Sequence, residues 1–474
     1  MENVRPNPDK LLEDIADYVM DKTIESTLAY ETAQFVLMDS IGCALLSLNF
    51  PACKKLLGPW IKGGEISQGA RVPGTKFVLD PIKAAFDIGT MIRWLDYNDT
   101  WLAKEWGHPS DNLGALLSVM DYVARNPEFG RTYTIRDLCE ALIKTHEIQG
   151  ILALENSFNA IGFDHVVLVK VASTALATKL MGGTKAQVID ALSQAWLDGQ
   201  SLRTYRHAPN TGSRKSWAAG DATSRAVRLA MMTLQGEMGY PSVLTAPKWG
   251  FQECYFKGEP MTLAQPLDSY VMENILFKIS FPAEFHAQTA VEVAIDLHAD
   301  LAPRLHKIEK IVIYTQEAGK RIIDKKGPLY NPADRDHCIQ YMVAVGLLKG
   351  ALKAEFYEDD FAKDPEIDRL RDKMKVIEDP QYTKDYFDPK MRAIPNRLEI
   401  HFQNGDDTLI KELHYPVGHK QRRKEGIPLL KEKFIYNTSR LYPQKVDEWF
   451  NLFEHSETLL SMSVNEFMDK WHIQ

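Results

Sequence analysis

Residues 95–112 place acidic, hydroxyl and imidazole side chains close together, in the order LDYNDTWLAKEWGHPSDN. If Ile92–Leu102 is helical, Asp96 and Thr100 lie one turn apart on the same face. Proline disfavours helical backbone in the residue before it, so His108 is expected in an extended loop. A histidine backed by an acid can transfer protons near neutral pH. The plainer interpretation is a loop whose polar side chains only satisfy buried backbone groups.

The helix expected over Leu113–Val123 follows this loop, with Asp111 and Asn112 as candidate N-cap residues. The N-terminus of a helix carries partial positive charge and attracts anions. The aromatic residues are expected to pack the scaffold around the acid and the imidazole. They are Trp94, Trp101 and Trp106.

Three further clusters carry cations or hydroxyl groups. RTYRHAPNTGSRKSW contains Arg206, Arg214 and Lys215, and it leads into a predicted helix. A lysine at a helix start opposes the helix dipole, which makes more sense if an anionic ligand shares the site. Lys278 lies in FKISFPAEFH, before an expected proline-started helix, and Tyr330 lies in the turn-rich KKGPLYNPADRDH. The plainer interpretations are a basic surface loop, a linker lysine and a connecting turn.

The familiar metal and nucleotide motifs do not occur. The five cysteines are scattered without a CxxC pair, as in reduced cytosolic proteins, and no HExxH is present. The DYNDT stretch lacks the glycine and the acidic twelfth ligand of a calcium loop. P-loop, GxGxxG and GxSxG motifs are also absent. We therefore expect no metal and no cofactor.

Charge argues against nucleic-acid binding. The formal net charge is -8, and the basic run HKQRRK at 419–424 has no interleaved aromatic residues. A solvated loop is the favoured interpretation of that run. The N-terminus lacks an apolar signal segment, and Phe35–Cys53 is predicted to be a buried helix and its end rather than a membrane span. We expect a cytoplasmic protein.

The chain predicts a mostly α fold in which a large all-helical domain is interrupted by a smaller α+β domain. Helical spacing dominates up to about residue 260, for example over Ala33–Leu48. Strand patterns appear at Lys307–Thr315 and at Arg397–Phe402, with a hairpin turn at Asn404-Gly405 leading to a strand over 408–413. An apolar helix is expected over Asp336–Lys349. We assign residues 1–267 and 418–474 to the helical domain, and 268–417 to the α+β domain.

Five separated strings resemble the MmgE/PrpD superfamily. They are LDYNDTW…GHPSDN, SRKSWAAGDA, GEMGYPS, FKISFPAEFHAQTA and GPLYNPADRDH. The resemblance covers nearly the whole chain and is best to the branch of 2-methylcitrate dehydratases. The spacing from Thr100 to His108 is two residues longer than in the more distant cis-aconitate decarboxylase, which also favours the dehydratase branch.

The resemblance implies a helical domain, an inserted α+β lid, a cleft between them that holds the active site, and a homodimer. It implies a reaction that needs no metal. The matched active-site positions are Asp96, Thr100, His108, Lys215, Lys278 and Tyr330. His165 matches a family histidine in a local sequence that departs from the family's FHP form.

The expected substrate is a small tricarboxylate, and the expected reaction is dehydration of 2-methylcitrate to 2-methyl-cis-aconitate in the methylcitrate cycle of propionate catabolism, with citrate as a second substrate. Lys215 and Lys278 are expected to bind carboxylates, with His165, Arg206 and Arg214 as further ligands. The roles of base and acid stay open. So do three alternatives: a cis-aconitate decarboxylase, an epimerase or isomerase of related polycarboxylates, and a non-catalytic carboxylate-binding protein.

Overall fold

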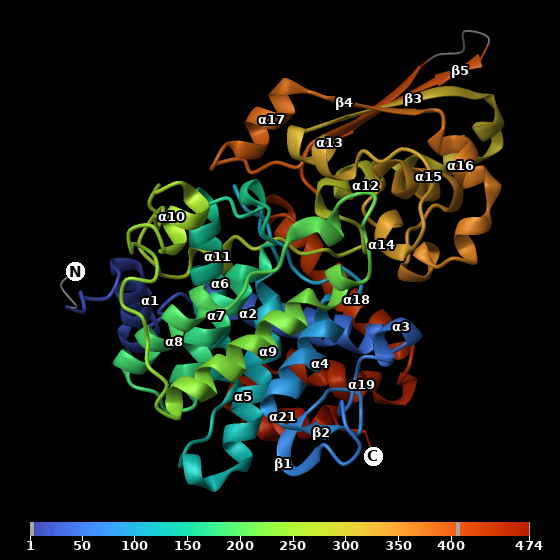
Figure 1. The fold of residues 1–474 in the computed structure, drawn as a ribbon. Helices are drawn as coiled ribbons and strands as arrows, with labels where there is room; N and C mark the ends of the chain where they lie inside the picture. The colour runs from blue at the N-terminus through green and yellow to red at the C-terminus, as the bar shows by residue number, and fades with distance from the viewer. Residues whose placement is uncertain (1–3, 404–407, 474) are drawn as a thin grey trace.

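Helices form most of the computed structural model, which describes residues 4–403 and 408–473 (Figure 1). Eleven α-helices lie in the described residues before position 275. They are α1 (Lys10–Asp21), α2 (Thr27–Ser47), α3 (Pro51–Lys54), α4 (Pro81–Arg93), α5 (Leu113–Arg125), α6 (Ile135–Glu155), α7 (Val166–Leu180), α8 (Lys185–Leu197), α9 (Arg214–Leu234), α10 (Phe251–Phe256) and α11 (Tyr270–Glu273). The prediction of a mostly α protein is confirmed.

The middle of the chain combines helices with a four-stranded sheet. Its helices are α12 (Gln288–Leu301), α13 (Glu317–Ile323), α14 (Pro332–Arg335), α15 (Ile339–Lys349), α16 (Pro365–Arg371) and α17 (Pro380–Phe387). Its strands are β3 (Ile308–Thr315), β4 (Met374–Glu378), β5 (Asn396–Phe402) and β6 (Leu409–Leu413). They lie in the order β4-β3-β5-β6, with β3 parallel to β4 and antiparallel to β5. Figure 1 shows α12 and α15 on one face of this sheet.

The two predicted hairpin strands are confirmed as β5 and β6, which pair antiparallel from Asn396 opposite Leu413 to Ile400 opposite Leu409. The turn predicted at 404–405 lies outside the described residues. The strand predicted at 307–315 corresponds to β3, and the apolar helix predicted from 336 begins at Ile339 as α15. Strand β4 was not predicted.

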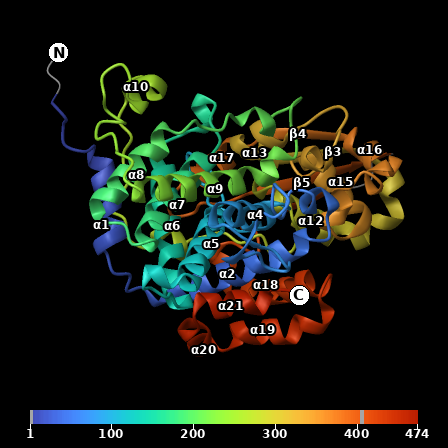
Figure 2. The same ribbon diagram turned by 60° about the horizontal axis from the view of Figure 1, so that its bottom comes forward.

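The C-terminal helices return to the helical part of the molecule. They are α18 (Arg423–Ser439), α19 (Val446–Glu454), α20 (Ser456–Ser461) and α21 (Val464–Trp471). Helix α18 packs against α2, and α21 packs against α5. Figure 2 shows this red group along one side of α2, so the two ends of the chain share one layer of helices.

The helical part is not entirely helical, because it contains a small antiparallel sheet of β1 (Glu65–Arg71) and β2 (Val78–Leu79). Helix α2 covers the predicted helix at 33–48 and is buried along most of its length. Its first turn is capped by Ser26, whose Oγ accepts a hydrogen bond from Ala29 N at 3.2 Å. Within the described residues, no helix combines the length and the apolar character that crossing a membrane requires.

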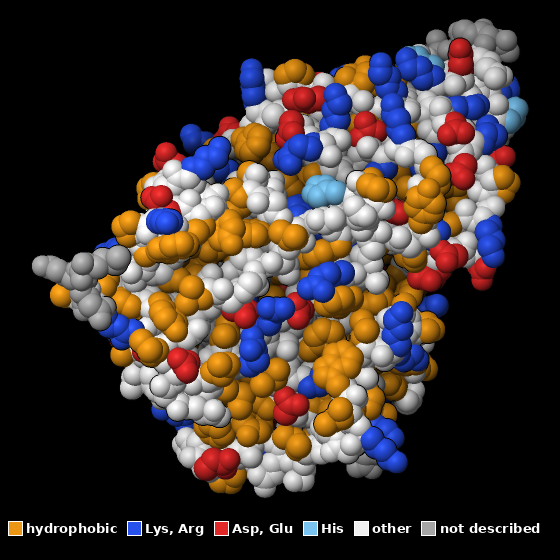
Figure 3. Space-filling model, in the orientation of Figure 1, with side chains coloured by type: hydrophobic (Ala, Val, Ile, Leu, Met, Phe, Trp, Pro, Cys, Tyr) orange, Lys and Arg blue, Asp and Glu red, His pale blue; other side chains and the backbone are white. Residues whose placement is uncertain are grey.

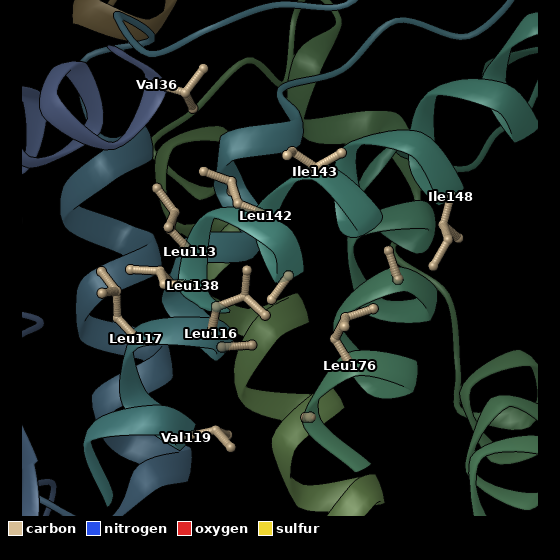
Figure 4. Close-up of a cluster of buried hydrophobic side chains, with 14 of the residues drawn as sticks. Val36, Leu113, Leu116, Leu117, Val119, Leu138, Leu142, Ile143, Ile148 and Leu176 are labelled. Atoms are coloured by element: carbon tan, nitrogen blue, oxygen red, sulfur yellow. The ribbon is translucent and has the colours of Figure 1, made fainter. Parts of the chain in front are cut away.

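Two hydrophobic cores lie on either side of the residues near 276–281. The larger core draws on α1 to α9 and on α18 to α21. Figure 4 shows part of it, where Leu116 of α5 and Leu142 of α6 lie between Val36 of α2 and Leu176 of α7. The smaller core lies between the four-stranded sheet and helices α12 and α15, and includes Leu102 and Trp106 from the helical part.

Helices α4 and α9 approach closely because glycine lies at their contact. A Cβ on Gly220 of α9 would lie 2.4 Å from the carbonyl oxygen of Phe86 in α4, far inside a normal contact. Helix α4 leads to Asp96, and α9 carries Lys215 near its start. The glycine contact therefore sets the distance between two candidate functional segments.

Candidate active site

A small cavity of about 20 Å³ lies where the two cores meet. Six of the residues that the sequence singles out line it: Asp96, Thr100, His108, His165, Arg206 and Lys278. The side chains come from α4 and the loop after it, from the segments before α7 and α9, and from the 276–285 segment and residue 337. The cavity has room for about one water molecule. Its side chains therefore leave little free space between them.

The segment after α4 is not helical, which corrects the helix expected over Ile92–Leu102. Helix α4 ends at Arg93, and Asp96 has φ 50°, outside the helical region. Thr100 then exchanges two backbone hydrogen bonds with Leu276, at 2.8 and 3.0 Å. This short bridge, rather than a helix face, brings Asp96 and Thr100 beside Lys278.

Asp96 is the centre of a buried ionic cluster. Its Oδ1 lies 2.8 Å from Lys278 Nζ and 3.4 Å from His108 Nε2, and it pairs with Arg93. The Lys278 ammonium also donates to the Asp96 carbonyl at 2.7 Å. Burial alone would raise the pKa of Asp96, but Arg93 and Lys278 outweigh it and hold that pKa well below its usual range. Asp96 is therefore a carboxylate.

His108 is oriented by the backbone. Its Nδ1 lies 2.6 Å from the carbonyl oxygen of Asp99, which can only accept, so Nδ1 carries the proton. Thr100 Oγ1 lies 3.3 Å from the same nitrogen. Burial, with the charge of Arg93, lowers the pKa of His108 well below its usual value. The ring is neutral, and the unprotonated Nε2 faces Asp96 and the cavity.

The loop that holds His108 is fixed by buried polar contacts. Asp99 Oδ2 lies 2.7 Å from His146 Nε2, and Asp99 Oδ1 accepts from the backbone and the hydroxyl of Ser110 at 3.0 and 2.6 Å. Asn112 is the N-cap residue of α5, one of the two candidates predicted, and Asp111 is not. Neither side chain caps α5; a 3₁₀ turn, Pro109–Asn112, precedes the helix. Asn112 instead donates to Gln149 Oε1 at 2.8 Å.

Lys215 lies near the start of α9, as predicted, and its ammonium joins the helical part to the segment before α15. Both Asp336 oxygens lie 2.6 Å from Lys215 Nζ, and His337 Nδ1 lies 3.2 Å away. Burial lowers the pKa of Lys215 and, to about 4, that of His337. Asp336 thus pairs with the Lys215 ammonium, which could instead bind a carboxylate group of a ligand.

Lys278 does not precede a proline-started helix. The residues after Pro282 form a 3₁₀ turn, Phe285–Ala287, and α12 begins at Gln288. Burial lowers the pKa of Lys278 from its usual value, although Asp96 opposes that change. The Gly418 backbone packs against this segment so closely that a Cβ there would lie 1.7 Å from the carbonyl oxygen of Phe277.

His165 and Arg206 form the wall nearest α7. Arg206 forms a two-point ion pair with Asp164, with its Nη2 3.1 Å from Oδ1. The His165 ring lies 5.7 Å from that of His108, and neither of its nitrogens has a hydrogen-bond partner among the described residues. Burial lowers the pKa of His165 well below its usual value. The ring is neutral and lines the cavity, with Nδ1 3.4 Å from Asp164 Oδ1.

Three predicted site residues do not line the cavity: Lys215, whose neighbour His337 does, Arg214 and Tyr330. Arg214 pairs with Asp221 at 3.2 Å and lies over the ring of Trp217 at 4.3 Å. Tyr330 is 70 % exposed. Neither lines the cavity, so their roles stay predictions that require movement of their segments.

Four charged or titratable residues at the cavity were not singled out from the sequence: Arg93, Arg203, Glu284 and His337. All four lie in or next to strings that were already marked: Arg93 just before LDYND, Arg203 at the start of RTYRHAPNTGSRKSW, Glu284 in FPAEFH and His337 in DRDH. Arg203 lies over Trp106, with its guanidinium 5.1 Å from the ring. Trp106 therefore helps form the wall, in addition to its packing role.

Within residues 4–403 and 408–473, no three His, Cys, Asp or Glu side chains are grouped as they would be around a metal ion. Figure 3 shows acidic and basic side chains interspersed on the face drawn.

Comparisons with known proteins agree with the motifs. The MmgE/PrpD N-terminal domain model matches residues 13–264, and the MmgE/PrpD C-terminal domain model matches 281–456. The chain is 56% identical to 2-methylcitrate dehydratase of Escherichia coli (strain K12) over 479 residues, covering 99% of each chain. It is 57% identical to 2-methylcitrate dehydratase of Cupriavidus necator, covering 99% of this chain and 98% of the relative.

A more distant relative is the probable 2-methylcitrate dehydratase of Saccharomyces cerevisiae, 53% identical over 98% of this chain and 93% of that protein. Two family models that together span most of the chain, and full-length relatives at more than half identity, leave one conclusion. The chain belongs to the MmgE/PrpD family.

Proposed function

We propose that this protein is a hydro-lyase that dehydrates 2-methylcitrate to 2-methyl-cis-aconitate in the methylcitrate cycle, and that it also acts on citrate. The observation that carries the proposal is the placement of a neutral His108, with Nε2 free, in a cavity lined by Lys278, Arg206 and Arg93. The cations match the carboxylates of a tricarboxylate, and the imidazole supplies the base. The full-length relatives named 2-methylcitrate dehydratase support the choice of substrate.

Substrate carboxylates replace the protein's own carboxylates at the cations. Lys215 is held by Asp336, Arg206 by Asp164 and Lys278 by Asp96. A buried cation needs a paired anion, because an unpaired buried charge is costly. Exchange of one paired anion for another keeps each cation compensated.

His108 Nε2 takes the proton from the methyl-bearing carbon beside a carboxylate. The C–H electrons move to that carboxylate as an enediolate, which Lys278 and Lys215 stabilise as charge develops. They then form the double bond as the C–O bond of the tertiary hydroxyl breaks. The imidazolium is stabilised by Asp96, whose Oδ1 lies 3.4 Å from Nε2.

The leaving hydroxide takes a proton and departs as water. Thr100, whose hydroxyl lies 3.3 Å from the His108 ring, and Tyr330 are the predicted hydrogen-bond donors on this side. Because Tyr330 is exposed in this structure, its part requires its loop to fold over the substrate. Alternatively, the His108 imidazolium returns the abstracted proton to the leaving hydroxyl, which departs as water without a second proton donor.

We propose that the α+β part is a lid. The helical domain would comprise 1–267 and 418–474, and the lid 268–417, in accordance with the two separate cores. A cavity of about 20 Å³ is far smaller than a tricarboxylate requires. The substrate therefore enters only if the lid moves relative to the helical domain. A homodimer is proposed on the family resemblance, and a cytoplasmic location on the five free cysteines.

The deciding experiment incubates the purified, chelator-treated protein with 2-methylcitrate and follows the ultraviolet absorbance of the conjugated alkene. Citrate and cis-aconitate are assayed in parallel, with carbon dioxide release measured on the latter. We expect absorbance to rise with 2-methylcitrate and, more slowly, with citrate. Activity seen only as carbon dioxide release would identify a decarboxylase instead, and inversion without alkene would identify an epimerase.

A further inference from the structure

A second, larger cavity of about 400 Å³ lies beside the active-site cavity. Three segments form its rim: residues 270–276, 389–392 and 419–421. Trp101 and Leu102 form its inner wall, and Leu102 also lines the active-site cavity. We call this second cavity the basic pocket.

The charges that line the basic pocket are all positive. Lys390, Arg392 and Lys420 contribute to it, and no Asp or Glu does among the described residues. Lys420 donates to Asn274 Oδ1 at 2.7 Å, and in the described part of the chain none of the three cations has a carboxylate oxygen within salt-bridge distance. The acid nearest in sequence, Asp388, accepts from the Lys390 backbone N at 2.8 Å and does not line the pocket.

Arg392 is held in an unusual conformation at the pocket wall. Its φ is 43°, a left-handed backbone that side-chain-bearing residues seldom adopt and that is often found at ligand sites. Its Nη1 donates to the Leu102 carbonyl at 3.1 Å, and its guanidinium lies 5.3 Å from the Trp101 ring. Its Nε is buried without an acceptor among the described atoms.

A fourth cation, Arg423, lies behind the rim of the basic pocket and adds to its positive electrostatic potential. Arg423 donates to the carbonyl of Ile275 at 2.7 Å and lies over the Phe277 ring at 5.1 Å. Its Nε also lacks an acceptor among the described residues, and burial lowers its pKa to about 10. Several cations around one hollow, none paired with a carboxylate among the described residues, create a positive potential that attracts anions.

We propose that the basic pocket is a second ligand site, which binds a small anion carrying two or more carboxylate or phosphate groups. Three cations from two segments, 389–392 and 419–421, can engage different groups of such an anion. Trp101 and Tyr270 offer apolar walls, and the volume fits a small molecule rather than a macromolecular surface. The basic run at 419–424 thus supplies Lys420 to the rim and Arg423 behind it.

Titration calorimetry on the full-length protein tests the proposal with two separate probes, tricarballylate and pyrophosphate. Neither probe has a hydroxyl to eliminate, so the result does not depend on the proposed dehydration. We expect at least one probe to bind the wild type, and its affinity for the basic pocket to fall about tenfold or more in Lys390→Gln/Lys420→Gln. Both lysines are exposed, so the variant keeps its fold, which its melting temperature checks.

Two controls separate the sites. Lys424→Gln removes an exposed cation from the same run that does not line the pocket, and its affinity for the probe should be unchanged. Lys278→Met disables the active-site cavity and should leave the second binding event in place. The proposal is overturned if neither probe binds, if binding is unchanged in the double variant, or if all binding disappears in Lys278→Met. Binding of one probe alone tells a carboxylate site from a phosphate site.

Discussion

At the scale of single residues, the geometry of His108 decides its role. The Asp99 carbonyl fixes the proton on Nδ1, and Nε2 remains available beside Asp96. A base that performs the rate-limiting proton transfer contributes roughly a hundredfold or more to turnover. We expect His108→Ala to lower kcat by roughly that factor while KM changes little, since the lysines that bind carboxylates remain.

Steady-state kinetics on 2-methylcitrate measures this effect. His455→Ala removes an exposed imidazole in the C-terminal helices and should leave both constants unchanged. A near-normal kcat for His108→Ala would remove His108 from the mechanism.

The protonation of His108 gives a second prediction. Burial and Arg93 hold its pKa well below the usual 6.5, so the ring is neutral in the free protein from pH 8 down to 6.5. Carbon-13 NMR of labelled histidine, with His108→Gln to assign the signal, should show no titration of His108 in this window. Tricarballylate adds negative charge to the cavity and should raise that pKa. A midpoint above 6.5 in the free protein would contradict the assignment of His108 as a neutral base.

At the scale of elements, the approach of α4 to α9 fixes the distance between Asp96 and Lys215. In Gly220→Ala the new methyl would meet the Phe86 carbonyl oxygen and Thr90 Oγ1, each 2.4 Å away. Helices forced apart lose packing, and overpacking of this kind costs about 1–3 kcal/mol. We expect that loss in urea unfolding, together with a lower kcat.

Gly199→Ala is the matched control, because a Cβ at that position has no neighbour within 4 Å. Its stability should change by no more than about 0.5 kcal/mol. Equal effects of the two substitutions would mean that backbone entropy, rather than the helix contact, governs the response.

Some helices and strands could be predicted from the sequence, whereas others could not. Apolar spacing in α2 and alternation in β3 and β5 are local signals, and each corresponds to an element in the structure. Strand β4, MKVIE, is short and preceded by charged residues, and it gains its pairing only from β3. The end of α4 at Arg93 likewise depends on distant partners: Leu276, which pairs with Thr100, and Lys278, which pairs with Asp96.

Some residues of the candidate site could likewise be predicted from the sequence, whereas others could not. Residue type and motif context pointed to Asp96, His108 and Lys278, because acids, imidazoles and lysines carry chemistry wherever they are brought together. His337 could not be found in this way, because its part rests on contact with Lys215, 122 positions earlier. The choice between a capping role and a side-chain network for Asn112 also depended on Gln149, on another helix.

At the scale of the whole molecule, the Lys215–Asp336 pair joins the helical part to the α+β part. Its two contacts of 2.6 Å are buried, so neither group is screened by solvent. If the α+β part is a lid, this pair helps to hold it closed over an empty cleft. A substrate carboxylate that pairs with Lys215 would release Asp336. The helical part and the α+β part would then be connected through the bound ligand.

Asp336→Asn tests this tie by hydrogen exchange and mass spectrometry. Loss of the carboxylate leaves Lys215 without its ion pair, so local opening becomes easier and amides of 331–338 should exchange about tenfold faster or more. Amides of β3 should be unaffected, because its pairing with β4 and β5 is unchanged. Asp359→Asn is the matched control, since Asp359 pairs at 2.8 Å with Arg335 of the same α+β part and is itself exposed. Equal exchange in the two variants would show that the Lys215–Asp336 pair does not hold the parts together.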